Sequence, residues 1–460
     1  APEIRKHQQE ISLSGDFKGK ISRFNFNNFD IEFNGKNQIK GKVSLGGLPD
    51  FSETFINLDI SNGSIDAQYM QTMFAPQTYG FLSLFGRTQL NGKFIGYIND
   101  FVAAGTFNTQ MGRIISNINL KVAEEIKNSE YKGHLEMKDF DLGKFSDRSF
   151  FQKVTLDGEI EGKGLNFYTA DFQLKGAIEK IGVLNYEYTN IETDAHFANQ
   201  FFEGTTSIDD PNLKFSLEGA IDLREGRDSY NAKINLKKAN LKPLNLSKYN
   251  ILLITDLNID AKGLKIDSIS GKADFRNTFI EYDGKPLVID SLLINTSHMK
   301  GNRALTITSD LFESKIEGTY NYTTAIKSLV ILLKEYRLNI NNDQYALSNY
   351  YRNKGTSEQE QFVINYEIYL KKFTPVIQLF EENIELSNNI KVSGMYSNGY
   401  TSILSVNSSI DTLSYRGNEF YEMDIDIATS KIGDSTNVLA MGFVSSKSQK
   451  LLSSVNTENL

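Results

Sequence analysis

The side chains of this chain that could bind a metal ion or transfer protons are four histidines and a few adjacent pairs of acidic residues. The histidines are His7, His134, His196 and His298, which stand at no spacing typical of metal ligands. His134 and His196 lie within alternating patterns typical of strands, so we interpret them as strand-surface residues. The acidic pairs at 124–125 and 209–210 adjoin turn signals, which favours solvated caps over a general acid and base.

Other signatures of catalysis are missing from the sequence. The 460 residues include no cysteine, which excludes disulfides, thiol catalysis and cysteine-ligated zinc. The stretch GKGLN at 162–166 has too few glycines for a phosphate-binding loop and precedes no predicted helix. No nucleophile elbow, dinucleotide-binding fingerprint or calcium loop occurs. We therefore expect no catalytic residue, no metal and no cofactor, and we do not expect an enzyme.

The composition is that of a folded protein with neutral or apolar partners. Hydrophobic residues make up 40% of the chain and charged residues 23%, which is too apolar for intrinsic disorder. The net charge of −8, without lysine- or arginine-rich runs, argues against nucleic-acid binding. The longest apolar run, SLVILL at 328–333, is far shorter than the roughly 20 residues of a membrane-spanning helix. Because neither an initiator methionine nor a signal peptide precedes the first strand, we expect a piece of a longer protein.

Alternation of apolar and polar residues with a period of two runs through most of the chain and predicts an all-β fold. Tyr131, Gly133, Leu135 and Met137 form one such set. Turn signals recur in or near the predicted strands, at Asn91-Gly92, Asp157-Gly158 and Asp283-Gly284. At roughly 8 to 12 residues per strand and turn, the chain would hold about 40 strands.

Three short segments instead have helical spacing. Residues 66–74 predict a helix behind a cap at Ser64, ended by Pro76. A second, amphipathic helix is predicted over 323–342, and a third begins at Thr374-Pro375. The second would place Ile326, Leu329, Leu333 and Tyr336 on one face. We expect it to cover core rather than lie on a membrane, because it has few basic residues for anionic lipid.

An internal repeat organises the strands. Shifted by 99 residues, the segment 131–145 falls on 230–244 without a gap, and 153–167 falls on 252–266 in the same register. We therefore predict strand repeats over 1–104 (with the short helix near 66–74), 105–203 and 204–322, then the helix at 323–342 and further strands over 343–460. Units of this size that bury their apolar face only against neighbours would build an elongated structure.

A one-sided apolar lining is the functional feature that remains. In the stretch LNGKFIGYINDFVAAGTFNT (90–109), two strands joined near Asn99-Asp100 would place apolar residues on one face. That face could be a dry core, in a closed sandwich or β-helix, or an open groove filled by acyl chains. The predicted lining residues are Phe94, Ile98, Phe107, Leu135, Met137, Ile160, Phe215, Leu217, Ile234, Leu236 and Ile259.

Several segments resemble the β-rich region of the TamB family, in the AsmA-like superfamily, and especially its Bacteroidota versions. They are SLGGLPDFSETFINLDI (44–60), LNGKFIGYINDFVAAGTFNTQMGRIISNINLKV (90–122), YKGHLEMKDFDLGKF (131–145), VTLDGEIEGKGLN (154–166) and LNYEYTNIETDAHF (184–197). The resemblance covers most of residues 11–320 and, more loosely, the rest. It implies an elongated, curved, antiparallel-rich β-sheet, the β-taco groove, with a few short helices.

The resemblance also implies a function in the cell envelope. Members of the family are anchored in the inner membrane by an N-terminal helix, cross the periplasm, and meet an Omp85-family outer-membrane protein. We therefore expect a periplasmic bridge that binds phospholipid acyl chains and carries them between the two membranes. The family's N-terminal anchor is not found in this sequence. Two alternatives stay open: a scaffold that assembles outer-membrane β-barrels by strand addition, and a closed-core β-solenoid of structural or adhesin type.

Overall fold

The chain is all-β in the computed structural model, with 66% strand and 12% helix. The model describes residues 11–33, 37–50, 52–71, 76–341, 344–354, 360–433, 435–452 and 455–458. These residues form 26 strands in two compact units. Unit 1 comprises residues 1–224 and 243–246, and unit 2 comprises residues 225–242 and 247–460. The strands are fewer than the roughly 40 expected from spacing, because most are 9 to 15 residues long.

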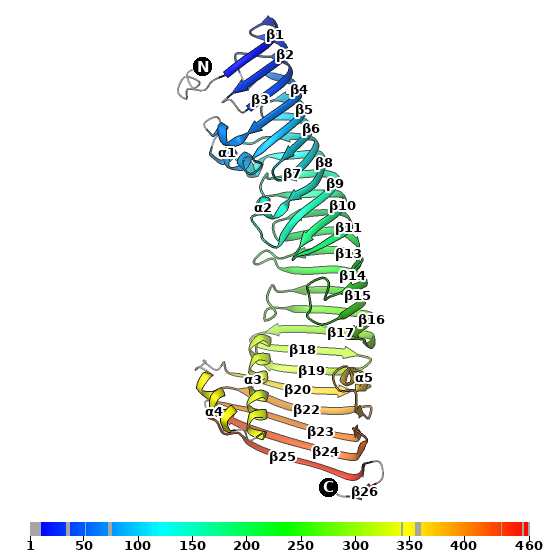
Figure 1. Cartoon of the computed structure of the whole chain (residues 1–460). Coiled ribbons are helices and arrows are strands. Elements are labelled where there is room, and N and C mark those ends of the chain that lie inside the picture. The colour runs from blue at the N-terminus through cyan, green and yellow to red at the C-terminus, as the bar shows by residue number, and fades with distance from the viewer. Residues whose placement is uncertain are drawn as a thin grey trace. The chain divides into compact units, whose positions relative to one another are not determined.

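Unit 1 is an antiparallel meander in which each strand pairs with its neighbour along the chain (Figure 1). Its strands are β1 (Ile11–Lys20), β2 (Arg23–Phe33), β3 (Asn37–Gly46), β4 (Phe55–Asp66), β5 (Arg87–Tyr97), β6 (Asp100–Thr109), β7 (Gly112–Lys121), β8 (Glu130–Asp141), β9 (Phe151–Lys163), β10 (Asp171–Val183), β11 (Tyr186–Ala198), β12 (Phe201–Asp209) and β13 (Leu213–Asp222). The short helices η2 (Ala67–Met70), α1 (Pro76–Ser83), η3 (Ile126–Asn128) and α2 (Leu142–Ser146) lie between strands.

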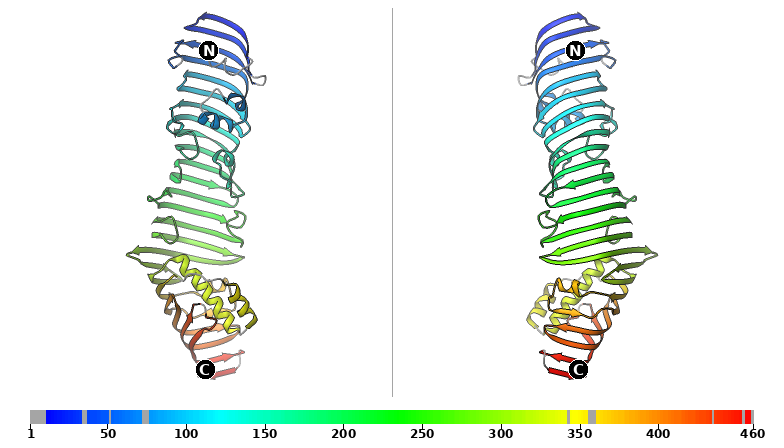
Figure 2. Two further views of the ribbon diagram at one scale, coloured as in Figure 1. Left: turned by 90° about the vertical axis from the view of Figure 1, so that its left-hand side faces the viewer. Right: turned by 90° about the vertical axis from the view of Figure 1, so that its right-hand side faces the viewer.

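Unit 2 is also antiparallel, from β14 to β26, but β20 pairs with β22 and β21 with β23. Its strands are β14 (Ser229–Asn240), β15 (Ile251–Lys262), β16 (Ser270–Tyr282), β17 (Lys285–Met299), β18 (Asn302–Ser309), β19 (Phe312–Thr319), β20 (Phe362–Leu370), β21 (Ile384–Leu386), β22 (Ile390–Asn398), β23 (Thr401–Tyr415), β24 (Asn418–Ile432), β25 (Leu439–Leu451) and β26 (Val455–Glu458). Its helices are α3 (Tyr322–Ile340), α4 (Gln344–Asn353) and α5 (Thr374–Gln378). Figure 2 shows α3 and α4 on one face of the strands.

The predicted helices are present, with corrections at their ends. Over 66–71, the described part of this segment, the chain forms the 3₁₀ turn η2, capped by the Asp66 side chain, while Ser64 belongs to β4. Pro76 begins α1 instead of ending a helix, because a first helical residue needs no N–H donor. Residues 72–74 lie outside the described part. The helix α5 starts at Thr374, whose hydroxyl donates to Leu386 O (3.1 Å) rather than capping the helix.

Glycines in two of the predicted turns lie within strands. Asp283-Gly284 is a two-residue turn, but Asn91-Gly92 belongs to β5 and Asp157-Gly158 to β9. Gly158 lies directly opposite Gly176 in β10. A Cβ on Gly176 would lie 2.3 Å from Asp157 O and 2.5 Å from Gly158 Cα, so the backbones approach too closely for any side chain.

β-Bulges interrupt the alternation in several strands. Between Met137 and Phe140 two residues of β8 oppose one residue of β9, and Asp139 takes the left-handed conformation (φ 50°). Met137 and Phe140, three residues apart, therefore face the same side and share one core cluster. The same bulge occurs in β2 at Asn28, and the following Phe29 is as buried as Phe140, at 2% exposure.

Element bounds recur at the 99-residue spacing found in the sequence. The strands β8 and β14 differ by 99 residues at both ends, and so do β10 and β16. The bulge between Met137 and Phe140 has its counterpart between Leu236 and Ala239. Residues 104 and 203, at which we placed boundaries between repeats, lie inside β6 and β12.

Asp210 differs from the solvated cap that the sequence predicts. Its side chain is 3% exposed and accepts hydrogen bonds from Tyr186 Oη (2.5 Å), Thr189 N (3.1 Å), Thr189 Oγ1 (2.9 Å) and Asn212 N (2.8 Å). Burial alone would raise the pKa of Asp210, but these hydrogen bonds together hold the pKa below its ordinary value. Its partner Asp209, the last residue of β12, is exposed as expected.

Replacing Asp210 by Asn should destabilise unit 1 by about 1–3 kcal/mol near neutral pH, because buried donors lose a charged acceptor. A carboxylate with a lowered folded pKa stabilises above its unfolded pKa, and this stabilisation is lost as the pH falls through the folded pKa. The difference between wild type and Asp210→Asn should therefore shrink only below about pH 4. Urea unfolding across pH measures it, and a constant difference down to pH 2 would contradict this assignment.

Replacing Gly176 by Ala should destabilise unit 1 by about 1–3 kcal/mol, because the new methyl group meets backbone atoms that cannot rotate away. Gly46→Ala is the matched control, since a Cβ on this strand glycine would have no atom within 4 Å. Urea denaturation followed by circular dichroism compares the two. Equal unfolding free energies for both variants would show that the close approach at Gly176 relaxes without cost.

Candidate functional site

One face of unit 1 carries apolar side chains in rows that cross the strands from β5 to β13. Directly opposite residues of antiparallel strands point to the same face of the sheet. The pairing register of neighbouring strands therefore identifies the residues of each row. The first row is Leu90, Phe107, Ile114, Met137, Leu156, Ile178, Ile191, Ile208 and Phe215. No polar residue interrupts this row over nine strands.

A second row, two residues further along each strand, is made mostly of small residues. It consists of Gly92, Gly105, Ser116, Leu135, Gly158, Gly176, Thr193, Thr206 and Leu217. A third row continues the face with Phe94, Ala103, Ile118, Gly133, Ile160, Leu174, Ala195, Gly204 and Gly219. We call these three rows the apolar face. Its central row has few large side chains, which leaves space between the two outer rows.

Ten of the eleven predicted lining residues lie in strands. Within each unit, these residues point to one face of the sheet. In unit 1 these are Phe94, Phe107, Leu135, Met137, Ile160, Phe215 and Leu217, and all belong to the three rows. The exception is Ile98, which lies in the turn between β5 and β6 and is 47% exposed. The turn comes one residue earlier than expected, so Gly96 rather than Ile98 faces Phe101.

The opposite face of unit 1 is polar and charged. His134 lies between two carboxylates, with Nε2 3.1 Å from Asp157 and Nδ1 3.1 Å from Glu159. Lys175 pairs with Asp194 across β10 and β11 at 3.0 Å. His134 and His196 are therefore surface residues of strands, as the sequence indicates, while His7 lies outside the described residues. The sheet of unit 1 thus has one wet face and one apolar face.

A surface pocket of about 570 Å³ lies near the strand ends beyond the third row, and most of its lining belongs to the charged face. Tyr131 and Phe172 line it together with Lys163 and Asp171. Burial, helped by the charge of Asp171, raises the pKa of Tyr131 to about 12, so this phenol stays neutral. The pocket offers both cationic and anionic groups beside apolar surface.

In unit 2, the predicted residues Ile234, Leu236 and Ile259 also share one face. The row through Ile259 continues to Ala273, Ile294 and Ile307. A parallel row on the same face reaches Leu305, Ile316 and Tyr366. The helix α3 covers this second row, because Ile316 packs against the cluster that holds Ala325 and Leu332 of the helix.

The helix α3 presents a different side to the sheet than its periodicity suggested. Leu329 and Tyr336 pack against the core as expected, with Ala325 and Leu332 beside them. Ile326 and Leu333 instead point outward, at 58% and 50% exposure. The helix has apolar residues on both sides, so spacing alone could not distinguish them.

Polar contacts fix the start of α3 on the sheet. Arg303 is 1% exposed, and its Nε donates to Tyr320 O at 3.2 Å, while its Nη2 donates to Asp267 O. The guanidinium lies over the Tyr322 ring, 4.5 Å from the centroid. The Asp267 carboxylate accepts from the backbone N (3.0 Å) and hydroxyl of Thr323 and thereby caps the helix.

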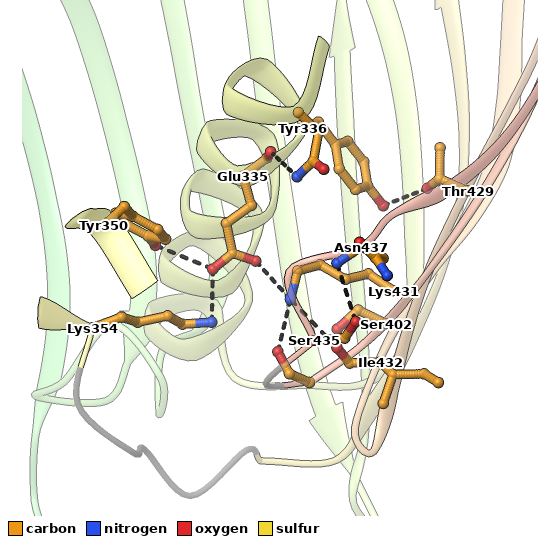
Figure 3. A network of polar contacts seen from close by, with 12 residues as sticks. Glu335, Tyr336, Tyr350, Lys354, Ser402, Thr429, Lys431, Ile432, Ser435 and Asn437 are labelled. Atoms are coloured by element: carbon orange, nitrogen blue, oxygen red, sulfur yellow. Dashed lines mark hydrogen bonds and ion pairs between the residues drawn. The ribbon is translucent and has the colours of Figure 1, made fainter. Parts of the chain in front are cut away.

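A buried ion-pair network holds the other end of α3 (Figure 3). Glu335, at 2% exposure, lies between Lys354 Nζ (2.6 Å) and Lys431 Nζ (2.9 Å) and accepts from Tyr350 Oη (3.2 Å). Lys431, at 3% exposure, also donates to Gly433 O at 2.7 Å. Burial and the nearby Glu335 raise the pKa of Tyr350 to about 12. The network ties α3 and α4 to β24.

No family model matches the chain, and no curated protein or solved structure is significantly similar to it. None of the described helices combines the length and apolar character that crossing a bilayer requires. Within the described part of the chain, no three histidine or acidic side chains are arranged to hold a metal ion. The geometry of the two faces is therefore the basis for assigning a function.

Sequence reasoning missed Arg303, Glu335 and Lys431. Each is a charged residue within an otherwise regular strand or helix pattern, which gives no signal of burial by itself. Glu335 could have been noticed because it follows the core residue Leu332 by three positions and precedes Tyr336. The partners Lys354 and Lys431 lie far along the chain, so their meeting depends on the tertiary fold.

Replacing Glu335 by Gln should destabilise unit 2 by about 3–5 kcal/mol, because Lys431 would remain buried without its carboxylate. Glu422→Gln is the matched control, since it breaks an exposed pair with Lys447 on the neighbouring strand (2.9 Å) and should cost at most about 1 kcal/mol. Urea unfolding and hydrogen exchange of α3 measure both effects. Equal losses for the two variants would contradict a special role of the buried network.

Proposed function

We propose that the apolar face binds the acyl chains of phospholipids, and that the chain is a section of a periplasmic bridge that carries phospholipid between the inner and outer membranes. The observation that carries this proposal is the apolar face of unit 1, which runs without a polar interruption in its first row from β5 to β13. Four residues of this row already pack in a core cluster that includes Leu142 and Phe145 of α2; they are Ile114, Met137, Leu156 and Ile178. For the rest of the face, an acyl chain is a cover of suitable chemistry.

The energetics of burial suit transport along this face. Removing apolar surface from water is favourable by about 25 cal/mol per Å². Binding therefore stabilises an acyl chain by several kcal/mol relative to water. A chain that slides from one strand to the next exchanges equivalent contacts, so its movement along the rows has a low barrier. Charged headgroups would stay in water near the strand ends, where Lys163 and Asp171 lie, because burying them is costly.

The architecture proposed for this function is a curved β-taco groove built of strand repeats. The recurrence of bounds and of a bulge at 99 residues, in β8 and β14, supports descent of these segments from one unit. The close approach at Gly158 and Gly176 favours a bent sheet, since paired glycines allow strands to bend. An Omp85-family outer-membrane protein and an inner-membrane anchor complete the proposal, both from the resemblance to the TamB family.

Phospholipid should copurify with the chain, and Leu217→Glu should reduce it several-fold, because a carboxylate on the apolar face repels an acyl chain. Ser216→Glu is the matched control, since the neighbouring residue of β13 is exposed on the polar face. Lipid extraction and mass spectrometry of both variants measure the effect.

Two results would contradict acyl-chain binding: purified wild type free of lipid that also takes up no fluorescent phospholipid, or equal lipid loss in both variants. Circular dichroism of each variant separates loss of binding from loss of fold. Loss of lipid in Leu217→Glu with an unchanged circular dichroism spectrum would support the proposal.

Strand addition to β-barrel clients is the second candidate, favoured by β25. Among the described strands, residues 439–446 pair only with β24, and Leu439, Met441 and Phe443 are 67%, 70% and 65% exposed. An exposed apolar edge invites another strand. A photo-crosslinker at Met441, with one at the buried Gln449 as control, would capture barrel clients if this function holds. The closed-core β-solenoid has less support, since every described strand pairing is antiparallel.

A further inference from the structure

The outward side of α3 carries an apolar stripe that no described residue covers. It consists of Ile326, Val330, Leu333 and Ile340, which are 58%, 60%, 50% and 82% exposed. Their spacing of four, three and seven residues places them on one side of the helix. Tyr345, at the start of α4, is 79% exposed. Isolated exposed apolar residues are ordinary on proteins, but four on one helix side form a patch.

The exposed charges on the described parts of α3 and α4 are all positive. Lys327, Lys334, Arg337 and Arg352 are exposed on α3 and α4. The single acidic residue in the described parts of these two helices is Glu335, which is buried in the ion-pair network. The whole chain has a net charge of −8, so two helices whose described parts carry four exposed cations and no exposed carboxylate depart from the average surface. The exposed Glu360, outside these helices, accepts from Asn321 at the start of α3 and lines a surface pocket with Lys327.

The stripe is held rigidly outward rather than exposed by a loose helix. The other side of α3 supplies Ala325 and Leu332, at 7% and 3% exposure, to the core. Glu335 and the Asp267 cap fix its two ends. Lys334 directly follows Leu333 of the stripe, and its Nζ lies 4.7 Å from the centroid of the Tyr350 ring of α4.

From the sequence we expect α3 to cover core rather than lie on a membrane, and one of its sides does cover core. The exposed cations on its other side and on α4 change the second part of that expectation. We propose that this side of α3 and α4 docks on the surface of an anionic lipid bilayer. Exposed apolar residues flanked by lysine and arginine are the arrangement by which helices lie in a membrane interface. Ile326, Val330 and Leu333 enter the boundary between headgroups and acyl chains, while the cations meet lipid phosphates. The proposal does not depend on lipid binding by the apolar face of unit 1, because it concerns side chains of α3 and α4 and not those of that face.

The test is flotation of the full 460-residue chain with vesicles of phosphatidylcholine containing about 30% phosphatidylglycerol, compared with pure phosphatidylcholine. Wild type should bind the anionic vesicles at least about ten-fold better, and added salt should weaken this binding. Val330→Glu should lower binding about ten-fold, because it puts a carboxylate in the stripe. The pair Lys327→Gln and Lys334→Gln should remove most of the preference for the anionic vesicles.

Val288→Glu is the matched control, since this valine of β17 is also solvent-facing, at 58% exposure. It should bind vesicles as wild type does. Equal binding of Val330→Glu and Val288→Glu would overturn the proposal, as would equal binding of wild type to both vesicle types. Light scattering that shows a dimer of wild type, converted to monomer by Val330→Glu, would assign the stripe to a second copy instead.

The outcome is separable from that of the proposed function. Val330→Glu should leave copurified phospholipid unchanged, and Leu217→Glu should leave vesicle flotation unchanged. A chain that binds no acyl lipid but floats with anionic vesicles would retain this inference and remove the other.

Discussion

The placement of apolar residue opposite apolar residue across antiparallel strands is the constraint on which the rest of this structure depends. Because side chains alternate, a slip of one residue in any pairing would turn the apolar face of one strand toward water. The register therefore has to be kept through every hairpin of unit 1. The bulges serve this constraint, since Met137 and Phe140 face one side in spite of their odd spacing.

The helix α3 shows a second constraint, which is the cost of placing charge under a helix. Glu335 and Lys431 lose nearly all their hydration, and their mutual attraction offsets this loss only while Lys354 and Tyr350 complete the network. Apolar residues in these places could give equal stability. The ion pairs add directionality, because a charge network accepts one position of the helix where an apolar surface accepts several.

The sequence was sufficient for the strand-rich fold and for most of the apolar face, and the reasons are local. Alternation identified Leu135, Ile160 and Leu217 because each lies in a regularly paired part of its strand. It failed at Ile98, because the turn position is set by the pairing of Tyr97 with Asp100 and not by hydrophobicity. It also misjudged Asp210, because three of its four hydrogen bonds come from Tyr186 and Thr189 of β11, which meet Asp210 only in the folded sheet.

In an antiparallel meander, the number of strands in the sheet can change in steps. Each strand of unit 1 makes its main contacts with the strand before and the strand after it, so stability is close to a sum of neighbour terms. Insertion or loss of one hairpin preserves strand direction and the sidedness of every row, whereas a single strand would reverse the direction of all that follow. Evolution can thus lengthen the apolar path by whole hairpins while leaving the existing registers intact.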